Sequence, residues 1–332
     1  MVSAVLVAAN NAPARTGLAR RLALPALIFL GLALLPPFAA LTAHQYLLDL
    51  ASRIMIFAVA AVALDLLVGY GGLISLGHAA FIGLGAYAVG ILSAEGIGDA
   101  LIALPVAVGV AMLFALGTGF VSLRTRGAYF IMITLAFGQM VYFIATSLAP
   151  YGGDNGLTID ARNTLAGVAL FNSDRAFYYV ILGFLVASYG FTRALIASRF
   201  GRVLRGAKEN AVRMATIGFD VERVRLIAYV IAGGLGGLAG FLLANSTEFV
   251  APAYMSWQRS GELLVMVILG GAGTLDGALV GSVVYLLAEE WLSGLMENWQ
   301  VIFGPLLVLV VLFARGGLIG LTARAWRRFG HD

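Results

Sequence analysis

The sequence lacks cysteine altogether and is poor in charge. Without cysteine the chain forms no disulfide and no thiolate metal site. Charged residues make up 11% of its 332 residues and apolar residues 61%, whereas soluble domains carry about 25% charged residues. A soluble fold of this length could not bury so much apolar surface, so we expect lipid to be the solvent for most of the chain.

Signatures of catalysis and nucleotide binding are also missing. Lys208 is the only lysine, and its surroundings do not form the G-x-x-x-x-G-K-[ST] phosphate loop. The sequence shows no catalytic triad, no His/carboxylate metal cluster and no cofactor motif. We therefore expect no enzymatic activity, no cofactor or metal in this chain and no nucleic-acid partner.

Long apolar stretches are what the sequence has in their place. About 20 apolar residues are needed to cross the hydrocarbon of a bilayer. Candidate spans are 22–41, 47–69, 72–93, 101–123, 128–148, 177–197, 225–245, 262–288 and 299–314. Because Gly270, Gly271 and Gly273 interrupt 262–288, and broken backbone at membrane depth must be sheltered by protein or a cavity, we expect this segment to dip in and return. The predicted fold is an all-α polytopic helical bundle of eight full spans and one broken, re-entrant pair.

Basic residues predict how the bundle is oriented. Of the 21, 17 lie in four places: 15–21, 124–126, 193–225 and 315–328. Loops rich in Arg and Lys stay in the cytoplasm. We therefore predict a cytoplasmic segment at 1–21, a transmembrane domain at 22–314 and a cytoplasmic tail at 315–332, in a bacterial inner membrane. The first apolar run is too long for a typical signal peptide, which is the alternative.

Two glycine-interrupted segments resemble each other and suggest an internal repeat. Leu64–Ala79 and Leu263–Ala278 each contain an apolar run, Gly-Gly, a hydroxyl residue, Leu and a small residue. Such breaks at matching places in two halves point to a transport pathway, although chance similarity between Gly-rich spans is an alternative. The predicted pathway residues are Gly71, Gly72, Ser75, His78, Gln139, Gly270, Gly271 and Thr274. For His78 a packing role, and for Gln139 a helix-to-helix hydrogen bond, remain open.

Ionisable residues inside the membrane are functional candidates by default. Asp49 and Arg53 are four residues apart, so we expect them to pair on one helix face. Asp65, near the inner end of the same span, is a candidate interfacial anchor.

Two loops are candidates for contacts with partner proteins. In 198–225, Ala207, Ala211, Ala215 and Gly218 recur at helical spacing, which predicts one helix with a small-residue docking face, ended by Gly218. In the outer loop 149–175, Gly152, Asp154 and Asn155 suit turns and are candidates to meet a soluble protein. An ordinary solvated loop is the alternative in both places.

Five stretches, in order along the chain, carry a family resemblance. They are GGLISLGHAAFIGLGAYAVG (71–90), RGAYFIMITLAFGQ (126–139), GGDNGL (152–157), the loop 198–225 with Glu209-Asn210, Ala215 and Gly218, and SGELLVMVILGGAGTLDG (260–277). The sequence resembles the branched-chain amino acid permeases of ABC importers, of the LivM type. It departs from their pattern at Ala211, Tyr151 and Ala278, where the family commonly has Glu, Thr and Pro.

The resemblance implies a permease subunit that moves branched-chain or other hydrophobic amino acids by alternating access. It implies a coupling loop that seats a short helix in an ATPase, with Arg205, Lys208, Glu209, Asn210, Ala215 and Gly218 as the expected coupling residues. The implied partners are two ABC ATPase subunits that bind ATP and magnesium, a second homologous permease and an amino acid-binding protein outside. A urea or short-amide permease is the alternative within this class. An ion-coupled secondary transporter, using Asp49, Asp65 or Asp276, is the alternative from another class.

Overall fold

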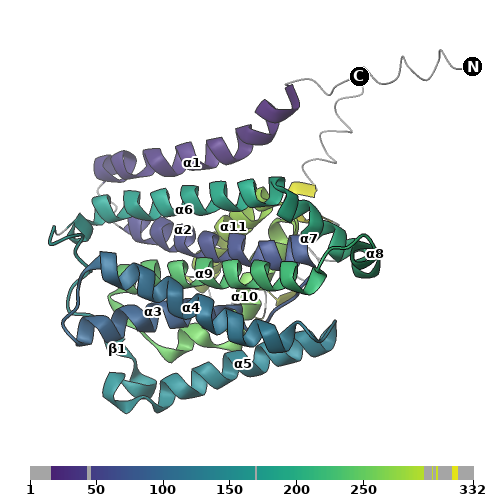
Figure 1. Cartoon of the computed structure of the whole chain (residues 1–332). Coiled ribbons are helices and arrows are strands. Elements are labelled where there is room, and N and C mark those ends of the chain that lie inside the picture. The colour runs from purple at the N-terminus through teal and green to yellow at the C-terminus, as the bar shows by residue number, and fades with distance from the viewer. Residues whose placement is uncertain are drawn as a thin grey trace, which may run out of the picture.

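The computed structural model describes residues 16–42, 46–168, 170–294, 301, 304, 305 and 316–320, and within this part the chain is a helical bundle (Figure 1). The helices are α1 (Thr16–Thr42), α2 (Tyr46–Asp65), α3 (His78–Ala94), α4 (Ala100–Ser122), α5 (Ala128–Ser147), α6 (Asp174–Ala197), α7 (Arg199–Glu209), α8 (Ala211–Thr216), α9 (Val221–Thr247), α10 (Trp257–Gly270) and α11 (Leu275–Ser293). A π-helical segment, Leu66–Gly71, continues α2. The predicted all-α polytopic fold is confirmed.

The remaining elements are short and lie in loops. Single 3₁₀ turns span Ala149–Tyr151, Gly153–Asn155, Leu170–Asn172 and Pro252–Met255. Strands β1 (Leu157–Thr158) and β2 (Phe249–Val250) form an antiparallel pair. Figure 1 shows β1 at one end of the bundle and α7 and α8 at the other, and we name these the β1 end and the α8 end.

Helices α1 to α6 and α9 fall on the first seven predicted spans. Five of these helices, α2, α4, α5, α6 and α9, are long and apolar enough to cross a membrane on their own. α3 is shorter than predicted because its 17 residues begin at His78 rather than at residue 72. The predicted span 299–314 lies almost entirely outside the described residues, as do most of the predicted terminal segments.

The predicted broken segment is confirmed as two helices. α10 and α11 together have the length and hydropathy of a span, but their axes bend by 117° between Gly270 and Leu275. The two helices pack against each other and against α2, so they form a hairpin, which we call the α10–α11 hairpin.

Helix α2 lies at the centre of the bundle. Every residue from Ile54 to Leu67 is buried, and α6, α9, α10 and α11 all pack against this helix. Figure 1 shows α1 and α5 on opposite flanks. Large apolar side chains on α4 and α5, among them Leu113 and Met132, are exposed, as expected of surfaces that face lipid. α2, by contrast, is apolar on all sides because other helices surround it.

Glycine allows α3 and α9 to cross closely. A Cβ atom on Gly240 would lie 2.0 Å from the carbonyl oxygen of Ile82, and one on Gly85 would lie 2.2 Å from that of Gly237. Helices in lipid gain little from the hydrophobic effect between them and associate through such close packing of small residues.

Two prolines determine how α1 attaches to α6. Pro36 and Pro37 lie inside α1, and because proline has no N–H, the carbonyls four residues earlier lose their helical partners. Those carbonyls belong to Leu32 and Ala33. The hydroxyl of Tyr178 donates to the Leu32 carbonyl at 2.8 Å, and that of Tyr179 donates to the Ala33 carbonyl at 3.3 Å. The adjacent tyrosines thus satisfy carbonyls that would otherwise be unpaired in an apolar environment.

We expect Tyr178→Phe to lower the free energy of unfolding by about 1 kcal/mol, because the Leu32 carbonyl then has no donor. In a Pro36→Ala background the restored amide can satisfy this carbonyl, so the same substitution should have almost no effect. The thermal midpoint of the purified protein in lipid nanodiscs measures both. Equal losses in the two backgrounds would show that the proline does not create the need for the tyrosine.

Candidate functional site

The first helix break follows α2. The helix widens to the π-helical segment Leu66–Gly71, Gly72 takes a left-handed conformation (φ +67°), and no regular helix forms until His78. The second break separates α10 from α11 at residues 271–274. There Gly271 and Gly273 have φ of +121° and +85°, a region that side-chain-bearing residues rarely adopt. Both glycine-rich sequences therefore interrupt helices, as predicted.

The two breaks are in direct contact. Asp65 accepts a hydrogen bond through Oδ1 from the backbone N–H of Gly273, at 2.7 Å. A Cβ atom on Gly69 would lie 2.3 Å from the same nitrogen, so only glycine at position 69 allows this approach. Asp65 is fully buried, and is therefore not an interfacial anchor but the link that holds the tip of the α10–α11 hairpin to α2.

The loop helix α7 contacts the first break. Lys208 donates from Nζ to the carbonyl oxygen of Gly69 at 2.6 Å, and a Cβ atom on Gly72 would lie 2.9 Å from Cγ of Lys208. The guanidinium of Arg205 lies 5.7 Å from the centre of the Tyr70 ring, within the range of a cation–π contact. The π-helical segment leaves a carbonyl that the lysine satisfies.

Further bonds attach α7 to two spans. Arg205 donates from Nη2 to the carbonyl of Ile196, at the end of α6, at 2.7 Å. Arg225 of α9 donates from Nη2 to the carbonyl of Ala207 at 3.0 Å. Helix α7 is therefore bound to α2, α6 and α9, and a displacement of this helix acts on all three.

The predicted single helix from Ala207 to Gly218 is wrong. α7 ends at Glu209, and Asn210 caps α8 by accepting from the N–H of Arg213 at 2.9 Å. Asn favours this position because its short side chain satisfies a free amide at a helix start. Ala207 is consequently buried and Ala215 exposed, so they share no face. Gly218, with φ +97°, follows the end of α8, and its predicted role as a helix stop is confirmed.

Apolar side chains are exposed around α8. Val212 is 67% exposed, Ile217 64% and Phe219 44%, and we call these three residues the α8 surface. They alternate with exposed charged residues, namely Arg213, Asp220, Glu222 and Arg223. Because charged residues surround them, these exposed apolar side chains do not lie in the hydrocarbon of the membrane. Exposed apolar groups with a polar rim are typical of a surface that binds another protein.

Basic residues from separate loops gather at the same end. A cavity of about 400 Å³ beside α8 has Arg124 and Arg126 of the α4–α5 loop, Val212 of α8 and Arg225 of α9 in its lining, together with Asp220 and Glu222. The sequence predicted these loops to lie on one side of the membrane, and the structure brings them together.

The eight predicted pathway residues divide into two groups. Gly71 and Gly72 lie at the first break, and Gly270, Gly271 and Thr274 at the second. Ser75 also lies in the first break and is buried. His78 begins α3 and is fully buried, with its ring edge-on to Phe81 at 5.3 Å between centroids, and Gln139 is half-buried on α5. Their contact with a transported molecule stays a prediction.

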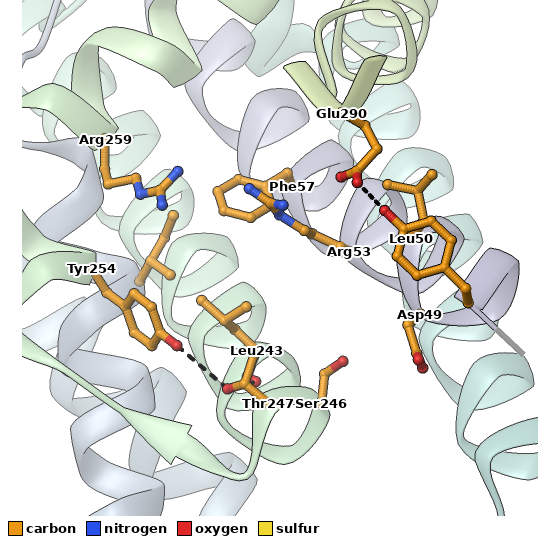
Figure 2. A pocket seen from close by; sticks show the side chains of 12 residues that line it. Asp49, Leu50, Arg53, Phe57, Leu243, Ser246, Thr247, Tyr254, Arg259 and Glu290 are labelled. Carbon is orange, nitrogen blue, oxygen red and sulfur yellow. Dashed lines mark hydrogen bonds between the residues drawn. The ribbon is translucent and has the colours of Figure 1, made fainter. Parts of the chain in front are cut away.

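A charged cavity lies near the β1 end, where α2 begins and α9 ends (Figure 2). It measures about 470 Å³, and its lining comes from α2, α3, α9, the Pro252–Met255 turn, α10 and α11. No residue of the predicted pathway lines this space. Sequence reasoning missed Arg259 and Glu290 there because α10 and α11 are far from α2 along the chain.

The ion pair expected between Asp49 and Arg53 is wrong. Arg53 instead contacts Glu289 of α11, with 3.1 Å between Nη2 and Oε1. Glu289, on another helix, lies closer to Arg53 than Asp49 does on the same helix. The Arg53–Glu289 ion pair therefore joins α2 to the hairpin.

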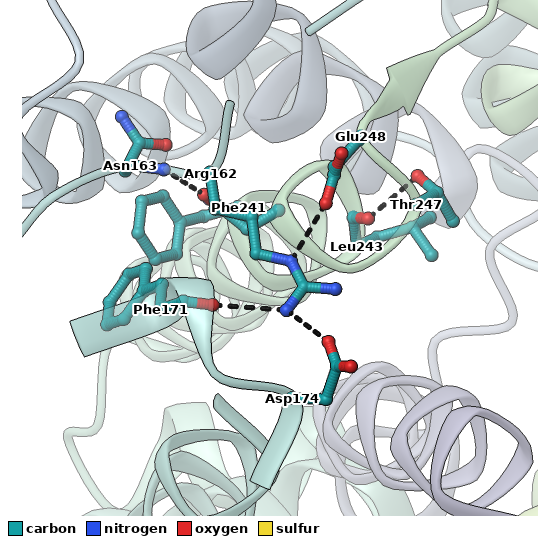
Figure 3. Close-up of polar contacts among 9 residues, drawn as sticks. Arg162, Asn163, Phe171, Asp174, Phe241, Leu243, Thr247 and Glu248 are labelled. Atoms are coloured by element: carbon teal, nitrogen blue, oxygen red, sulfur yellow. Dashed lines mark hydrogen bonds and ion pairs between the residues drawn. The ribbon is translucent and has the colours of Figure 1, made fainter. Parts of the chain in front are cut away.

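The loop 149–175 is held at the β1 end by Arg162 (Figure 3). Arg162 lies 2.7 Å from a carboxylate oxygen of Asp174 and 3.1 Å from one of Glu248, and it donates to the Phe171 carbonyl at 3.1 Å. The sequence singled out neighbours in this loop but missed Arg162.

Gly152, Asp154 and Asn155 form the turns predicted for them. Gly152 has φ +87°, and a Cβ atom there would lie 1.9 Å from the carbonyl oxygen of Gly156. The side chains of Asp154 and Asn155 are exposed. The loop is therefore shaped by contacts inside the chain, with two polar groups left accessible.

Residues 46–312 match the family model described as the branched-chain amino acid transport system / permease component. The chain belongs to this family. The matched residues include α2 to α11, and hence both helix breaks, the α7–α8 loop and the charged cavity of this permease.

Individual relatives agree with this assignment. The permease is 28% identical to the high-affinity branched-chain amino acid transport system permease protein LivM of Salmonella typhimurium and to that of Escherichia coli, over 82% of this chain and 70% of each relative. It is 26% identical to a probable LivM of Methanocaldococcus jannaschii, over 82% of this chain and 94% of the relative. No solved structure matches it significantly.

Removing the carboxylate that joins the breaks should destabilise the hairpin tip. Asp65→Ala leaves the half-buried N–H of Gly273 without its acceptor, which costs up to about 1–3 kcal/mol. Asp65→Asn retains an acceptor oxygen and should lose less. Protection of the amides of 271–275 from hydrogen exchange and the thermal midpoint should both be highest in the parent, lower in Asp65→Asn and lowest in Asp65→Ala. If Asn were as damaging as Ala, the charge rather than this hydrogen bond would be what matters.

Proposed function

We propose that this protein is the membrane-spanning subunit of an ATP-driven ABC importer for branched-chain or other hydrophobic amino acids. Family membership supports a permease, and the names of its relatives support this class of cargo. The observation that carries the ATP-driven part is the α8 surface, because it is joined through α7 to the first helix break and so to α2, the central helix of the bundle.

The proposed orientation puts the α8 end in the cytoplasm of a bacterium, with both chain termini on that side of the inner membrane. Arg124, Arg126 and the basic residues of 198–225 gather at this end, as expected for cytoplasmic loops. The β1 end, whose loops carry Glu95, Asp154 and Glu248, would then face outward.

Two ABC ATPase subunits, which bind ATP and magnesium, are the proposed partners at the α8 surface. Val212, Ile217 and Phe219 supply an apolar contact area among charged residues, as protein interfaces do. When the ATPases close on ATP, they displace α8 and α7. Lys208 and Arg225 then pull on α2 and α9, and the bundle alternates the side from which its centre is open.

A second homologous permease and an outer binding protein complete the proposed assembly. The chain is also 29% identical, over 125 residues, to the high-affinity branched-chain amino acid transport system permease protein LivH of Escherichia coli, a species whose LivM it resembles too. This double similarity supports a pair of related permeases. The exposed Asp154 and Asn155 of the outer loop are the proposed contacts for the binding protein.

Two other functions are separated from this one by transport assays. A urea or short-amide permease would use the same assembly, so uptake of labelled urea and leucine by the reconstituted complex distinguishes the cargo. An ion-coupled transporter would need no ATPase. Its best carboxylates are already engaged inside the protein, since Asp65 accepts from Gly273 and Asp276 accepts from the hydroxyl of Tyr189. Gradient-driven uptake by the isolated chain would support it.

Placing a charge on the α8 surface should release the ATPase. Val212→Asp and Ile217→Asp each put a carboxylate into the proposed apolar contact, and we expect at least about a tenfold loss of co-purified ATPase, since truncation at interface centres commonly costs 2 kcal/mol or more. Bulky substitutions at the exposed Ala215 and Gly218 should act in the same direction.

Val168→Asp is the matched control, because Val168 is 63% exposed but lies in the loop at the β1 end. It should leave the complex intact. Retention of the ATPase by both α8 variants, with all proteins folded by size-exclusion chromatography, would overturn the proposed docking surface.

A further inference from the structure

The cavity near the β1 end has charges of both signs on its walls. Arg53 and Arg259 line it, and so do Asp49 and Glu290. In Figure 2, Arg259 lies on one side of the space and Asp49 and Glu290 on the other, with Arg53 between them. A cavity that holds only water would not need charges of both signs on opposite walls.

Carboxylates behind the wall hold the two arginines in place. Glu289 contacts Arg53 at 3.1 Å and Glu262 contacts Arg259 at 2.7 Å, and neither glutamate lines the cavity. On the opposite side, the hydroxyl of Tyr46 donates to Glu290. Each arginine has five N–H donors, so one ion pair orients it and leaves other donors directed at the space.

Apolar side chains also line the cavity, beside hydroxyl groups of Ser, Thr and Tyr residues. The apolar ones include Leu50 and Phe57 of α2, Ile82 of α3 and Leu243 of α9. The volume of about 470 Å³ falls within the range of about 300–1,000 Å³ that is typical of small-molecule sites. The cavity thus offers an anion site, a cation site and an apolar wall in one space of ligand size.

Taking the cargo class from the proposed function, we propose that this cavity binds the zwitterion of an apolar amino acid. The ligand carboxylate lies against Arg53 and Arg259, the ammonium group against Asp49 and Glu290, and the side chain against Phe57, Ile82 and Leu243. This site is distinct from the predicted pathway residues at the glycine breaks.

The walls of the cavity connect this site to the α8 end. Asp49 and Arg53 belong to α2, whose far end carries Asp65 and the Gly69 carbonyl bound by Lys208. Arg259 and Glu290 lie on the two arms of the α10–α11 hairpin, whose tip Asp65 holds. A zwitterion bound between Asp49 and Arg259 therefore joins α2 to the hairpin at this end, as Asp65 does at the other end, where α7 is bound to the Gly69 carbonyl.

Binding of labelled leucine to the assembled complex in nanodiscs, without the outer binding protein, tests the site. Arg259→Gln and Asp49→Asn should each weaken leucine binding by about 10- to 100-fold, the effect of losing a hydrogen bond to a charged group. Arg175→Gln and Asp160→Asn remove exposed charges of the same sign near the same end and should leave binding unchanged.

Two leucine analogues show which charge each residue binds. The parent complex should prefer leucine to leucinamide, which lacks the carboxylate, and to 4-methylpentanoate, which lacks the ammonium group. Arg259→Gln should reduce only the first preference, because Arg53 remains, and Asp49→Asn only the second, because Glu290 remains. Because each variant is compared with itself, a general loss of folded protein does not imitate this result.

ATP-dependent uptake measured on the same samples separates the two proposals. If the parent complex imports no apolar amino acid, the proposed function fails and this site with it. If it imports leucine, but both variants bind leucine as tightly as the parent and prefer it to each analogue by the same factor, the function stands and the cavity is not the binding site.

Discussion

The contact between the two helix breaks is the constraint on which the rest of the structure depends. A buried carboxylate, Asp65, accepts from the amide of Gly273, and Gly69 packs against that amide with no room for a Cβ atom. Part of each broken segment is buried in protein, as irregular backbone at membrane depth requires. The contact fixes the depth to which the α10–α11 hairpin enters the bundle and thereby the position of Arg259 and Glu290 at its other end.

Helix α2 connects the two ends of the molecule. Near its start it lines the charged cavity, along its middle it is enclosed by α6, α9, α10 and α11, and beyond its last turn the Gly69 carbonyl receives Lys208 of α7. A close-packed helix transmits displacement along its axis because its neighbours leave it little space to bend. The only lysine of the chain is thus placed where motion at the α8 end reaches the centre of the permease.

Much of the fold was predictable because each helix that crosses lipid needs about 20 apolar residues in a row. Apolar length indicated the spans, and the glycines at 71–72 and 270–273 indicated both breaks. Contacts between distant segments were not predictable in the same way. Arg53 pairs with Glu289 rather than Asp49, and Tyr178 satisfies a carbonyl freed by Pro36, and neither partner follows from spacing. The helix prediction in the loop 198–225 was wrong because it relied on the spacing of the small residues and ignored the preference of Asn210 for the position before a helix start.

The most direct test of the central claim is the amount of leucine imported per ATP hydrolysed by the reconstituted complex, with Lys208 replaced. Lys208→Met removes the bond to the Gly69 carbonyl, and the account predicts that hydrolysis continues while leucine import per ATP falls. Lys208→Arg, which keeps a donor, should recover part of the loss, and Arg202→Met, an exposed position on the same helix, should behave as the parent does. An unchanged ratio in Lys208→Met would contradict the account.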